Sequence, residues 1–356
     1  MALARLNGVA VRGIVSALPA GVEETADVAA RFGDDAARRL AAATGIHARH
    51  LAAPDQCTSD LAVPAAQALL SGLGWDAADI DLLVFVSQTH DQVLPATACL
   101  VQRRLGLPKT VAAFDLSLGC SGYVYGLWAA GSALASLLPH PDGRPRRALL
   151  LAGDTTSRIL DPDDRAVAPL FGDAAAATAL EMDPAAPPLT VDLGTDGAGA
   201  PYLTVPGGAM RAPGTPPRLF MDGTQVFAFT LREVPAAIAT TLDAAGWDAA
   251  DVDRFVLHQA NEMMIRRLGQ KIGADERRLV LALARHGNTS SASVPLALTH
   301  AVAEDLKAGP LRLLLSGFGV GWSWATAAAT LGPLAVCETI ILPSPQAPGA
   351  AIRPLG

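Results

Sequence analysis

The chain has 356 residues, of which 51% are hydrophobic and 17% are charged, and its net charge is −7. The hydrophobic fraction excludes a disordered chain and supplies a large buried core. The negative charge argues against a protein that binds nucleic acid or an anionic membrane surface. At about 150 residues per domain, the length predicts two domains or one large duplicated domain.

The cysteines and the apolar segments limit the remaining classes. The four cysteines are widely spaced, with no CxxC pair and no Cys/His cluster, which argues against a metal site. The N-terminus lacks a continuous apolar run, so we expect no signal peptide and a cytoplasmic protein. The uncharged segment 313–337 is long enough to cross a membrane, but its glycines and proline indicate two buried strands joined by a tight loop.

Strands and helices alternate along the chain. The first half contains predicted strands over 8–16, 82–87, 111–116, 148–152 and 174–181 and predicted helices over 59–73, 97–105 and 121–138. The second half contains predicted helices over 227–245, 262–272 and 294–308, a strand over 255–258 and a strand pair within 313–331. Short apolar strands between helices indicate sheets that are buried on both faces. The segment 196–217, rich in proline and glycine, is predicted to be a surface loop that can cover a pocket.

A repeat relates the two halves. The sequence GWDAADID at 74–81 recurs as GWDAADVD at 246–253, and RALLLAG at 147–153 resembles LRLLLSG at 311–317. The two pairs occur in the same order and at similar spacing, which indicates an ancient duplication. We therefore predict an α/β protein with an N-terminal half over 1–185 and a C-terminal half over 186–356. Its helices and sheets would stack in a five-layer α/β/α/β/α sandwich.

Cys120 is the first candidate catalytic residue. It lies where a predicted strand ends and the helix over 121–138 begins. A thiol at a helix N-terminus faces the positive end of the helix dipole, which lowers its pKa and favours the nucleophilic thiolate. An inert, buried cysteine is the alternative at this position.

Two further candidates lie in the second half. His258 ends a predicted strand, and the carboxyl ends of strands in open α/β sheets face the ligand crevice; a core histidine is the alternative. Asn288 follows Cys120 at a spacing close to that of the repeats, so the two are candidates for equivalent positions; a turn or helix cap is the alternative. The glycine-rich loop 317–321 can bring backbone N–H groups close to a bound carbonyl, but it lacks the lysine of a phosphate-binding loop.

Three long motifs contain these candidates: CSGYVYGL at 120–127, HQAN at 258–261 and HGNTSSASVP at 286–295. Shorter motifs are LPATAC at 94–99, DPDDR at 161–165, FGDAAAA at 171–177 and GFGVGWSW at 317–324. Together they resemble β-ketoacyl-ACP synthase III of the thiolase-like superfamily, from about residue 8 to about residue 331 and in the family's order. The resemblance implies the duplicated thiolase fold, a homodimer and a Cys-His-Asn triad, which maps to Cys120, His258 and Asn288.

The resemblance also implies a mechanism. Cys120 accepts an acyl group from a thioester of CoA or acyl carrier protein, and a malonyl-type thioester then loses CO2 and condenses with it. His258 and Asn288 donate hydrogen bonds to the forming enolate, and the N–H groups of Cys120 and Val320 form the oxyanion hole. The thioesters are substrates, and no separate cofactor or metal is expected. The expected substrate-binding residues are Leu94, Arg165, Met221, Gly223, Phe227, Asn261, Phe318 and Gly319.

The sequence departs from the family pattern at several positions. The tryptophan and arginine that commonly enclose the CoA adenine are replaced by Arg39 and Ala43, and a basic residue of the carrier-protein contact is replaced by Met263. The aromatic residue that usually reaches across the dimer is replaced by Leu94. These departures indicate a specialised relative from secondary metabolism with an altered donor or acceptor.

Three other functions use the same residue types. An acyltransferase would pass the Cys120-bound acyl group to an oxygen or nitrogen acceptor, and malonate-dependent release of CO2 separates it from a ketosynthase. A papain-like cysteine hydrolase also uses Cys, His and Asn, but its local sequence around the cysteine is absent and the repeat indicates a different fold. The third alternative is a silent partner subunit, which acylation of Cys120 would exclude.

Overall fold

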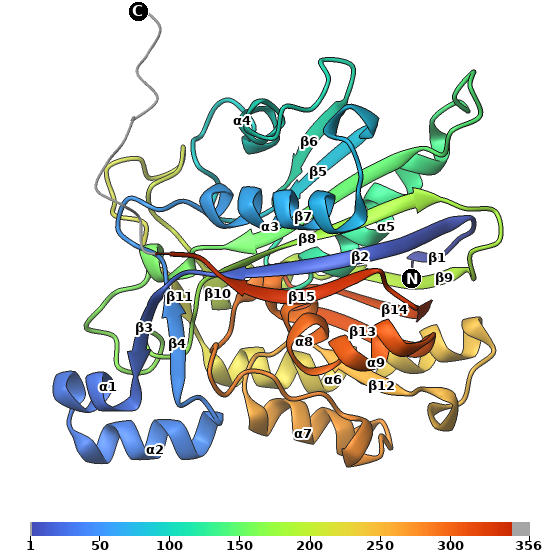
Figure 1. Cartoon of the computed structure of the whole chain (residues 1–356). Helices are drawn as coiled ribbons and strands as arrows, with labels where there is room; N and C mark the ends of the chain where they lie inside the picture. The colour runs from blue at the N-terminus through green and yellow to red at the C-terminus, as the bar shows by residue number, and fades with distance from the viewer. Residues whose placement is uncertain (1, 344–356) are drawn as a thin grey trace, which may run out of the picture.

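The computed structural model describes residues 2–343, in which two β-sheets alternate with layers of helices (Figure 1). The first sheet has the strand order β15-β2-β8-β7-β5-β6, and the second has the order β1-β9-β14-β13-β12. The first contains β15 (Val336–Ile341), β2 (Val9–Leu18), β8 (Ala174–Met182), β7 (Arg147–Asp154), β5 (Leu82–Val86) and β6 (Ala112–Leu116). The second contains β1 (Ala2–Leu6), β9 (Leu189–Thr195), β14 (Ser323–Leu331), β13 (Leu311–Gly319) and β12 (Arg254–Leu257).

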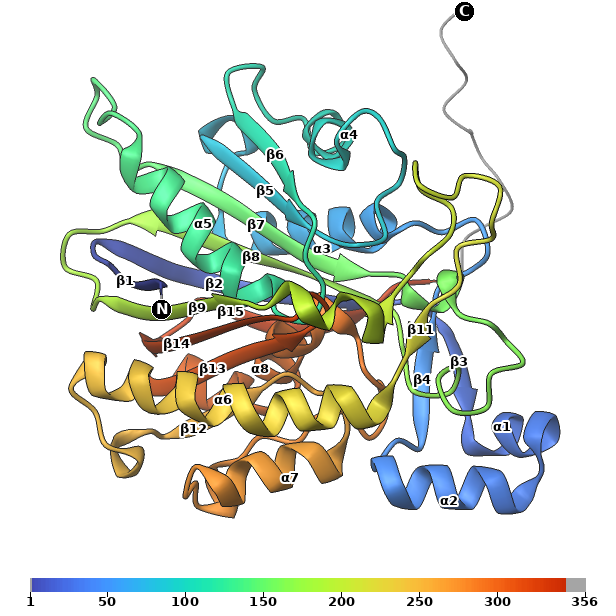
Figure 2. The same cartoon turned by 180° about the vertical axis from the view of Figure 1, so that it is seen from behind.

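Helices form three layers around these sheets (Figure 2). The outer face of the first sheet is covered by α3 (Thr58–Leu73) and α4 (Thr97–Arg104). The outer face of the second sheet is covered by α6 (Gly223–Ala245) and α7 (Glu262–Lys271). Between the sheets lie α5 (Gly122–Ser136) and α8 (Ser293–Ala301). This arrangement confirms the predicted five-layer sandwich.

The apolar core follows the layers. One cluster lies between the sheets, where Val124 of α5 packs with Leu315 of β13. A second joins α3 to the first sheet through residues such as Leu61, and a third joins α6 to the second sheet through residues such as Ile238. Because both faces of each sheet are covered, the strands are apolar along their length, as their sequences predict.

The repeated sequence forms the same structure twice. In each copy a left-handed glycine ends a long helix, a short 3-10 helix follows, and the chain enters β5 or β12. The guanidinium of Arg147 lies 4.3 Å from the ring centroid of Trp75, and that of Arg312 lies 5.4 Å from the ring centroid of Trp247. The strand order β5-β7-β8-β2 corresponds to β12-β13-β14-β9, with an isolated bridge at Leu279 in the place of β6. The two sheets are thus copies of one unit.

The two halves of the chain exchange their outermost strands. β1 pairs antiparallel with β9 in the second sheet, and β15 pairs parallel with β2 in the first. A cut at residue 185 therefore does not separate the sheets, because each contains a strand from the other half. The boundary between 1–185 and 186–356 stays a prediction, and residues 344–356 lie outside the described residues.

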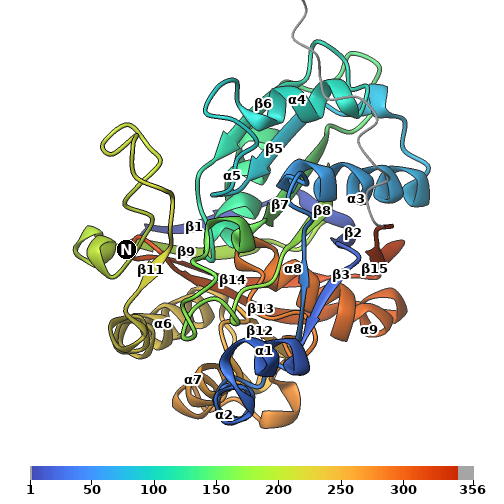
Figure 3. The same ribbon diagram turned by 90° about the vertical axis from the view of Figure 1, so that its left-hand side faces the viewer.

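The predicted elements occur within a few residues of their predicted bounds, with one exception. The helix predicted over 294–308 is two helices, α8 and α9 (Ala303–Ala308), separated at Val302, whose φ of −125° is not helical. The sequence analysis missed β1, β9 and β15. It also missed a projecting unit beside α7 (Figure 3), which consists of β3 (Gly21–Glu24), α1 (Thr25–Phe32), α2 (Asp34–Thr44) and β4 (Ala48–Leu51).

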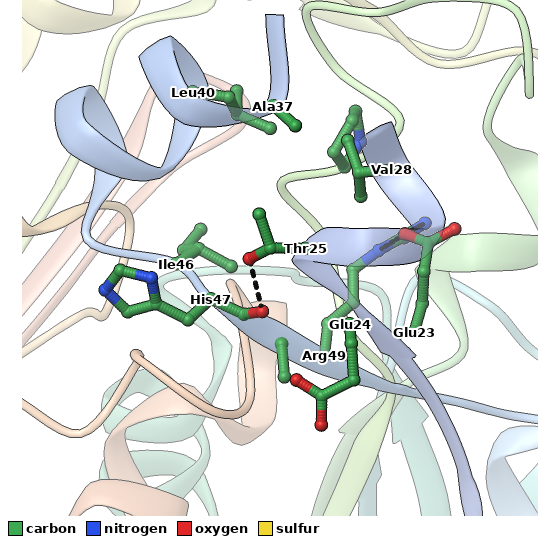
Figure 4. Close-up of a pocket in the computed structure, with 11 residues that line it drawn as sticks. Glu23, Glu24, Thr25, Val28, Ala37, Leu40, Ile46, His47 and Arg49 are labelled. Atoms are coloured by element: carbon green, nitrogen blue, oxygen red, sulfur yellow. Dashed lines mark hydrogen bonds and ion pairs between the residues drawn. The ribbon is translucent and has the colours of Figure 1, made fainter. Parts of the chain in front are cut away.

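The projecting unit borders a small pocket that is open to solvent (Figure 4). Its wall includes Val28 and Ala37, and Thr25 Oγ1 donates a hydrogen bond to the carbonyl of His47 at 2.8 Å. None of the three predicted catalytic residues lines this pocket. The candidate active site therefore lies elsewhere.

Within residues 2–343, every helix is too short or too polar to span a bilayer. The uncharged segment 313–337 forms β13, a tight loop, β14 and the start of β15. The prediction of strands for this segment is confirmed.

The duplication supplies a matched pair of stability variants. Asp81 accepts hydrogen bonds from the N–H of Arg147 at 3.0 Å and from Arg146 Nη1 at 2.6 Å, whereas its counterpart Asp253 accepts one from the N–H of Arg312 at 2.8 Å. We expect Asp81→Ala to lower the free energy of unfolding by about 2–3 kcal/mol and Asp253→Ala by about 1 kcal/mol. Urea denaturation followed by circular dichroism measures both. Asp81 also lies 2.8 Å from His140 Nε2, so equal losses would contradict a stabilising role for the contacts of Arg146 and His140 with this carboxylate.

Candidate active site

Cys120, His258 and Asn288 line one cavity of about 540 Å³. Cys120 lies just before α5, His258 just after β12, and Asn288 in the loop before α8. The cavity therefore forms where the two halves of the chain meet, and the structure brings the three predicted catalytic residues together. The other residues that line it are Leu170, Phe171, Leu203, Met221, Gly223, Val226, Ala260, Asn261, Met264, Phe318 and Gly319.

Cys120 is buried at the start of α5, with 8% of the residue exposed. Burial and the nearby carboxylate of Asp154 raise the pKa of its thiol to about 12. The lowered pKa predicted from the helix N-terminus is therefore wrong for this structure. Loss of solvation and the Asp154 charge outweigh the hydrogen bonds that favour the thiolate, and the thiol is protonated at neutral pH.

Three groups around the sulfur favour the thiolate. Hydrogen bonds from the Ser290 hydroxyl and from the backbone N–H groups of Cys120 and Val320 lower the thiol pKa. The two N–H groups are those of the predicted oxyanion hole. The end of β13 lies very close, because a Cβ added at Gly319 would be 3.0 Å from the sulfur. Only glycine permits this approach.

His258 is held in one orientation and is uncharged. Its Nδ1 lies 2.6 Å from Ser293 Oγ, and its ring stands edge-on to that of Phe318 with centroids 5.5 Å apart. Burial lowers the pKa of the imidazole to about 3. Because Ser293 engages Nδ1, Nε2 is the ring nitrogen left for a substrate.

Asn288 is fixed by its backbone and by its side-chain oxygen. Its N–H donates to the carbonyl of Leu170 at 2.8 Å, and its own carbonyl accepts from the N–H of Gly172 at 3.1 Å. Its Oδ1 accepts from the N–H of Ser290 at 2.9 Å. These contacts use the side-chain acceptor and leave the amide NH2 as the group that can donate to a substrate.

Cys120 also lines a second, larger cavity of about 1350 Å³. Much of its wall comes from the segment 200–219. This segment contains β10 (Leu203–Thr204), which pairs with β11 (Phe220–Met221) directly after it. This confirms that the loop predicted over 196–217 covers a pocket. Phe171 and Leu203 line both cavities, so the two cavities meet beside the thiol.

The structure divides the predicted substrate-binding residues into two groups. Those that line the smaller cavity are Met221, Gly223, Asn261, Phe318 and Gly319. Phe227 lines neither cavity at Cys120; it is half-buried against the apolar core, and its neighbour Val226 lines the smaller cavity. Leu94, which is 80% exposed, and Arg165, also exposed, lie outside both cavities. The substrate-binding roles of Phe227, Leu94 and Arg165 stay predictions.

Three polar residues of the site escaped the sequence analysis. Ser293 contacts His258, Ser290 contacts the Cys120 thiol, and Asp154 lines the larger cavity. Both serines belong to the motif at 286–295. The interpretation of that motif as a turn and helix cap does not predict that their hydroxyl groups contact His258 and Cys120. Asp154 directly follows the repeated sequence at 147–153, which is the signal that could have identified it.

We expect Gly319→Ala to displace the nucleophile. The added Cβ would lie 2.8 Å from Cys120 Cβ and 3.0 Å from its sulfur, so the thiol has to move. A misplacement of this size lowers the rate of reaction with an acyl thioester by about 10²-fold. Intact-protein mass spectrometry with a panel of acyl-CoA thioesters measures the rate. Gly197→Ala is the control, since a Cβ there meets no atom within 4 Å; equal rates in the two variants would refute the expectation.

Comparison with known proteins places this geometry in one family. Residues 114–197 match the family model of 3-oxoacyl-[acyl-carrier-protein (ACP)] synthase III, and residues 242–331 match the model of its C-terminal region. The chain is 38% identical to β-ketoacyl-[acyl-carrier-protein] synthase III 2 of Streptomyces coelicolor over 324 residues, which are 90% of this chain and 93% of that protein. It is also 38% identical to the β-ketoacyl-[acyl-carrier-protein] synthase III of Caulobacter vibrioides, over 90% of this chain and 99% of that one.

The fold agrees with the sequence comparison. A crystal structure of a 3-oxoacyl-(acyl-carrier protein) synthase from Burkholderia xenovorans superposes with a TM-score of 0.90 at 39% identity. The match covers 96% of this chain and 99% of that chain. On sequence, fold and extent of coverage, the chain belongs to the 3-oxoacyl-[acyl-carrier-protein] synthase III family.

Proposed function

We propose that the chain transfers an acyl group from a thioester to Cys120 and condenses it with a malonyl-type thioester that loses CO2. The product is a β-ketoacyl thioester, and the enzyme is an acyltransferase. The observation that supports this function is the shared cavity of Cys120, His258 and Asn288, with the N–H groups of Cys120 and Val320 at the sulfur. The proposed chemistry uses thioesters of CoA or phosphopantetheine and draws on no separate cofactor.

In the first step the Cys120 sulfur attacks the acyl thioester. A new C–S bond forms to Cys120, the bond to the carrier's sulfur breaks, and the thiol proton ends on the departing thiol. The neutral imidazole of His258, in the same cavity, can relay this proton. The Ser293 hydroxyl can donate to Nδ1 or accept from it, so it supports either tautomer that the relay requires.

In the second step the malonyl-type thioester loses CO2, and negative charge develops on its thioester oxygen. Nε2–H of His258 and the amide NH2 of Asn288 donate hydrogen bonds to this oxygen. The resulting carbanion attacks the acyl carbonyl, whose oxygen is stabilised by the N–H groups of Cys120 and Val320. The tetrahedral intermediate then collapses, its C–S bond to Cys120 breaks, and the thiolate takes up a proton from water, which its raised pKa favours.

We assign the two cavities to different parts of the substrates. The smaller cavity contains His258, Asn288 and Asn261, whose polar groups suit a phosphopantetheine arm and its thioester. The larger cavity is bounded by small residues such as Gly207 and Ala209, which leave room for an acyl chain. Cys120 lies at the junction, where the acyl group has to be transferred.

We also propose a cytoplasmic homodimer that acts on acyl-CoA or on acyl carrier protein. Within residues 2–343, β6 is one of the two edge strands of the first sheet, and β15 is the other. The loop between β5 and α4 exposes Val93 and Leu94, with 88% and 80% of their surfaces accessible. Exposed apolar residues and a free sheet edge are typical of a protein interface. In such a dimer Leu94 is the residue expected to reach the acyl cavity of the partner.

A role in secondary metabolism remains part of the proposal. Arg39 and Ala43 are exposed on α2, and Ala43 lines an open groove with Met263. The residues that line this groove include no tryptophan, and His47 carries the one ring on which an adenine can stack there, so the usual CoA contact is altered. Normal growth of a strain that lacks the housekeeping enzyme, when supplied with this chain, would argue against the specialised role.

Two measurements separate condensation from transfer to an oxygen or nitrogen acceptor. We expect acyl adducts on the intact protein that disappear in Cys120→Ala, because the sulfur is the acceptor. We also expect CO2 release from a malonyl thioester, which simple acyl transfer does not require. Intact-protein mass spectrometry measures the acyl adducts, and a CO2 assay measures the decarboxylation of the malonyl thioester. Adducts that persist in Cys120→Ala would refute the nucleophile, and acyl transfer without CO2 release would favour the alternative.

The hydrogen-bond donors should matter more for decarboxylation than for folding. We expect His258→Ala and Asn288→Ala each to lower CO2 release by about 10²–10³-fold with the fold retained. Because burial lowers the pKa of His258 to about 3, the imidazole is neutral above that pH. The rate of CO2 release should therefore show no inflection near pH 6.5, the ordinary value for histidine. A loss of activity centred there would contradict the neutral donor.

A further inference from the structure

Asp154 is a buried charge that the proposed chemistry does not use. It is the last residue of β7, is 1% exposed and lines the larger cavity with Cys120. A buried carboxylate is costly unless hydrogen-bond donors surround it. A negative charge beside a nucleophilic thiol also opposes formation of the thiolate. Both costs have to be offset by another role of this carboxylate.

Five hydrogen bonds surround this carboxylate. Oδ1 accepts from Ser87 Oγ at 3.1 Å, from the N–H of Gln88 at 2.7 Å and from Thr89 Oγ1 at 3.2 Å. Oδ2 accepts from the N–H of Ser291 at 3.2 Å and from its Oγ at 2.7 Å. The carboxylate thus joins the loop after β5, in the first half of the chain, to the turn before α8, in the second.

The turn that Asp154 holds is strained. Ser290 has a φ of +51°, and among residues 2–343 it is the one non-glycine residue with positive φ. Such a backbone persists only where surrounding contacts fix it. The N–H of Ser290 donates to Asn288 Oδ1 at 2.9 Å, and its hydroxyl hydrogen-bonds to Cys120. The bonds from Ser291 to Asp154 fix the same turn from its other end.

We propose that Asp154 is a positioning residue with two effects on the active site. Its carboxylate fixes the Ser290 turn so that Asn288 presents its amide to the substrate, and its negative charge, in the cavity that Cys120 also lines, opposes ionisation of the resting thiol. The first effect rests on the proposed function, because it requires Asn288 to act on a substrate. The second effect is a property of the thiol alone.

The electrostatics support the second effect. After burial, the charge of Asp154 is the next largest cause that raises the pKa of the Cys120 thiol. His258, the other titratable residue of the smaller cavity, is neutral and so contributes no opposing charge. Removal of the Asp154 charge should therefore make the thiol more acidic.

Asp173 provides a matched control. It is 0% exposed and accepts hydrogen bonds from the N–H of Ala52 at 2.8 Å, the N–H of Ser157 at 2.9 Å and Ser157 Oγ at 2.5 Å. It lines neither of the cavities that contain Cys120. Asp154→Asn and Asp173→Asn each remove one buried carboxylate. Only Asp154→Asn also removes the negative charge beside the Cys120 thiol.

The test compares these two variants with wild type in the full-length chain. The rate of Cys120 alkylation by iodoacetamide is followed as a function of pH, and CO2 release is measured with malonyl-pantetheine. We expect Asp154→Asn to be alkylated about tenfold faster at a given pH and to release CO2 about tenfold more slowly. We expect no faster alkylation in Asp173→Asn. Alkylation of Asp154→Asn at the wild-type rate or below would overturn the charge effect, and wild-type CO2 release would overturn the positioning effect.

Ser291→Ala separates the two effects and needs no change of charge. It removes the Oγ donor to Asp154, so we expect CO2 release to fall about tenfold with alkylation at the wild-type rate. Wild-type CO2 release in this variant would overturn the positioning effect even if Asp154→Asn did not fold. If the wild-type protein released no CO2, the proposed function would fail, whereas the alkylation rates would still decide the charge effect.

Discussion

The close approach of β13 to the start of α5 is the constraint on which the site depends. A Cβ added at Gly317 would lie 2.6 Å from the carbonyl oxygen of Cys120 and 2.9 Å from Ser121 Cα, so backbone packs directly against backbone. Because of the same contact, the backbone N–H of Val320, just after β13, can hydrogen-bond to the Cys120 sulfur. A side chain at either Gly317 or Gly319 would move the nucleophile away from its oxyanion hole.

Burial leaves Cys120 and His258 uncharged, with the Asp154 carboxylate as the charged group in the larger cavity beside the thiol. The Cys120 thiol is protonated and His258 is neutral, because neither ion is solvated between the two sheets. In such an environment each hydrogen bond to a developing charge is stronger than in water. In the proposed reaction the site therefore favours the enolate and the tetrahedral oxyanion, which would form at the donors, over a resting thiolate. Activation of the thiol depends on the arrival of the thioester and not on the helix N-terminus alone.

The sequence predicted the layers and the triad because their signals are local or duplicated. The copies of GWDAAD mark equivalent strands, and the motif around Asn288 marks the loop opposite Cys120. The exchange of β1 and β15 between the sheets was not predictable in this way, since it depends on pairing between distant segments. The direction of the thiol pKa was missed for a related reason: the helix dipole is local, whereas burial is a property of the packed protein. Phe227 and Val226 differ by one residue, about 100° around α6, so the packing of the helix decides which of them lines the cavity.

The duplication also explains why a nucleophile and an amide face each other. α5 and α8 lie in one layer, and Cys120 and Asn288 precede them. Their N-terminal segments differ, because α5 follows Ser121 directly, whereas a 3-10 helix over Ser290–Ala292 precedes α8. This extra turn carries the strained Ser290 to the thiol and Ser291 to the carboxylate from the first half. Two identical helix starts would present the same groups to the substrate twice. Because of the strained turn, the segment before α8 supplies hydrogen-bond donors instead of a second nucleophile. A decarboxylative condensation requires this difference between the two helix starts. One sulfur has to hold the acyl group while separate donors stabilise the enolate.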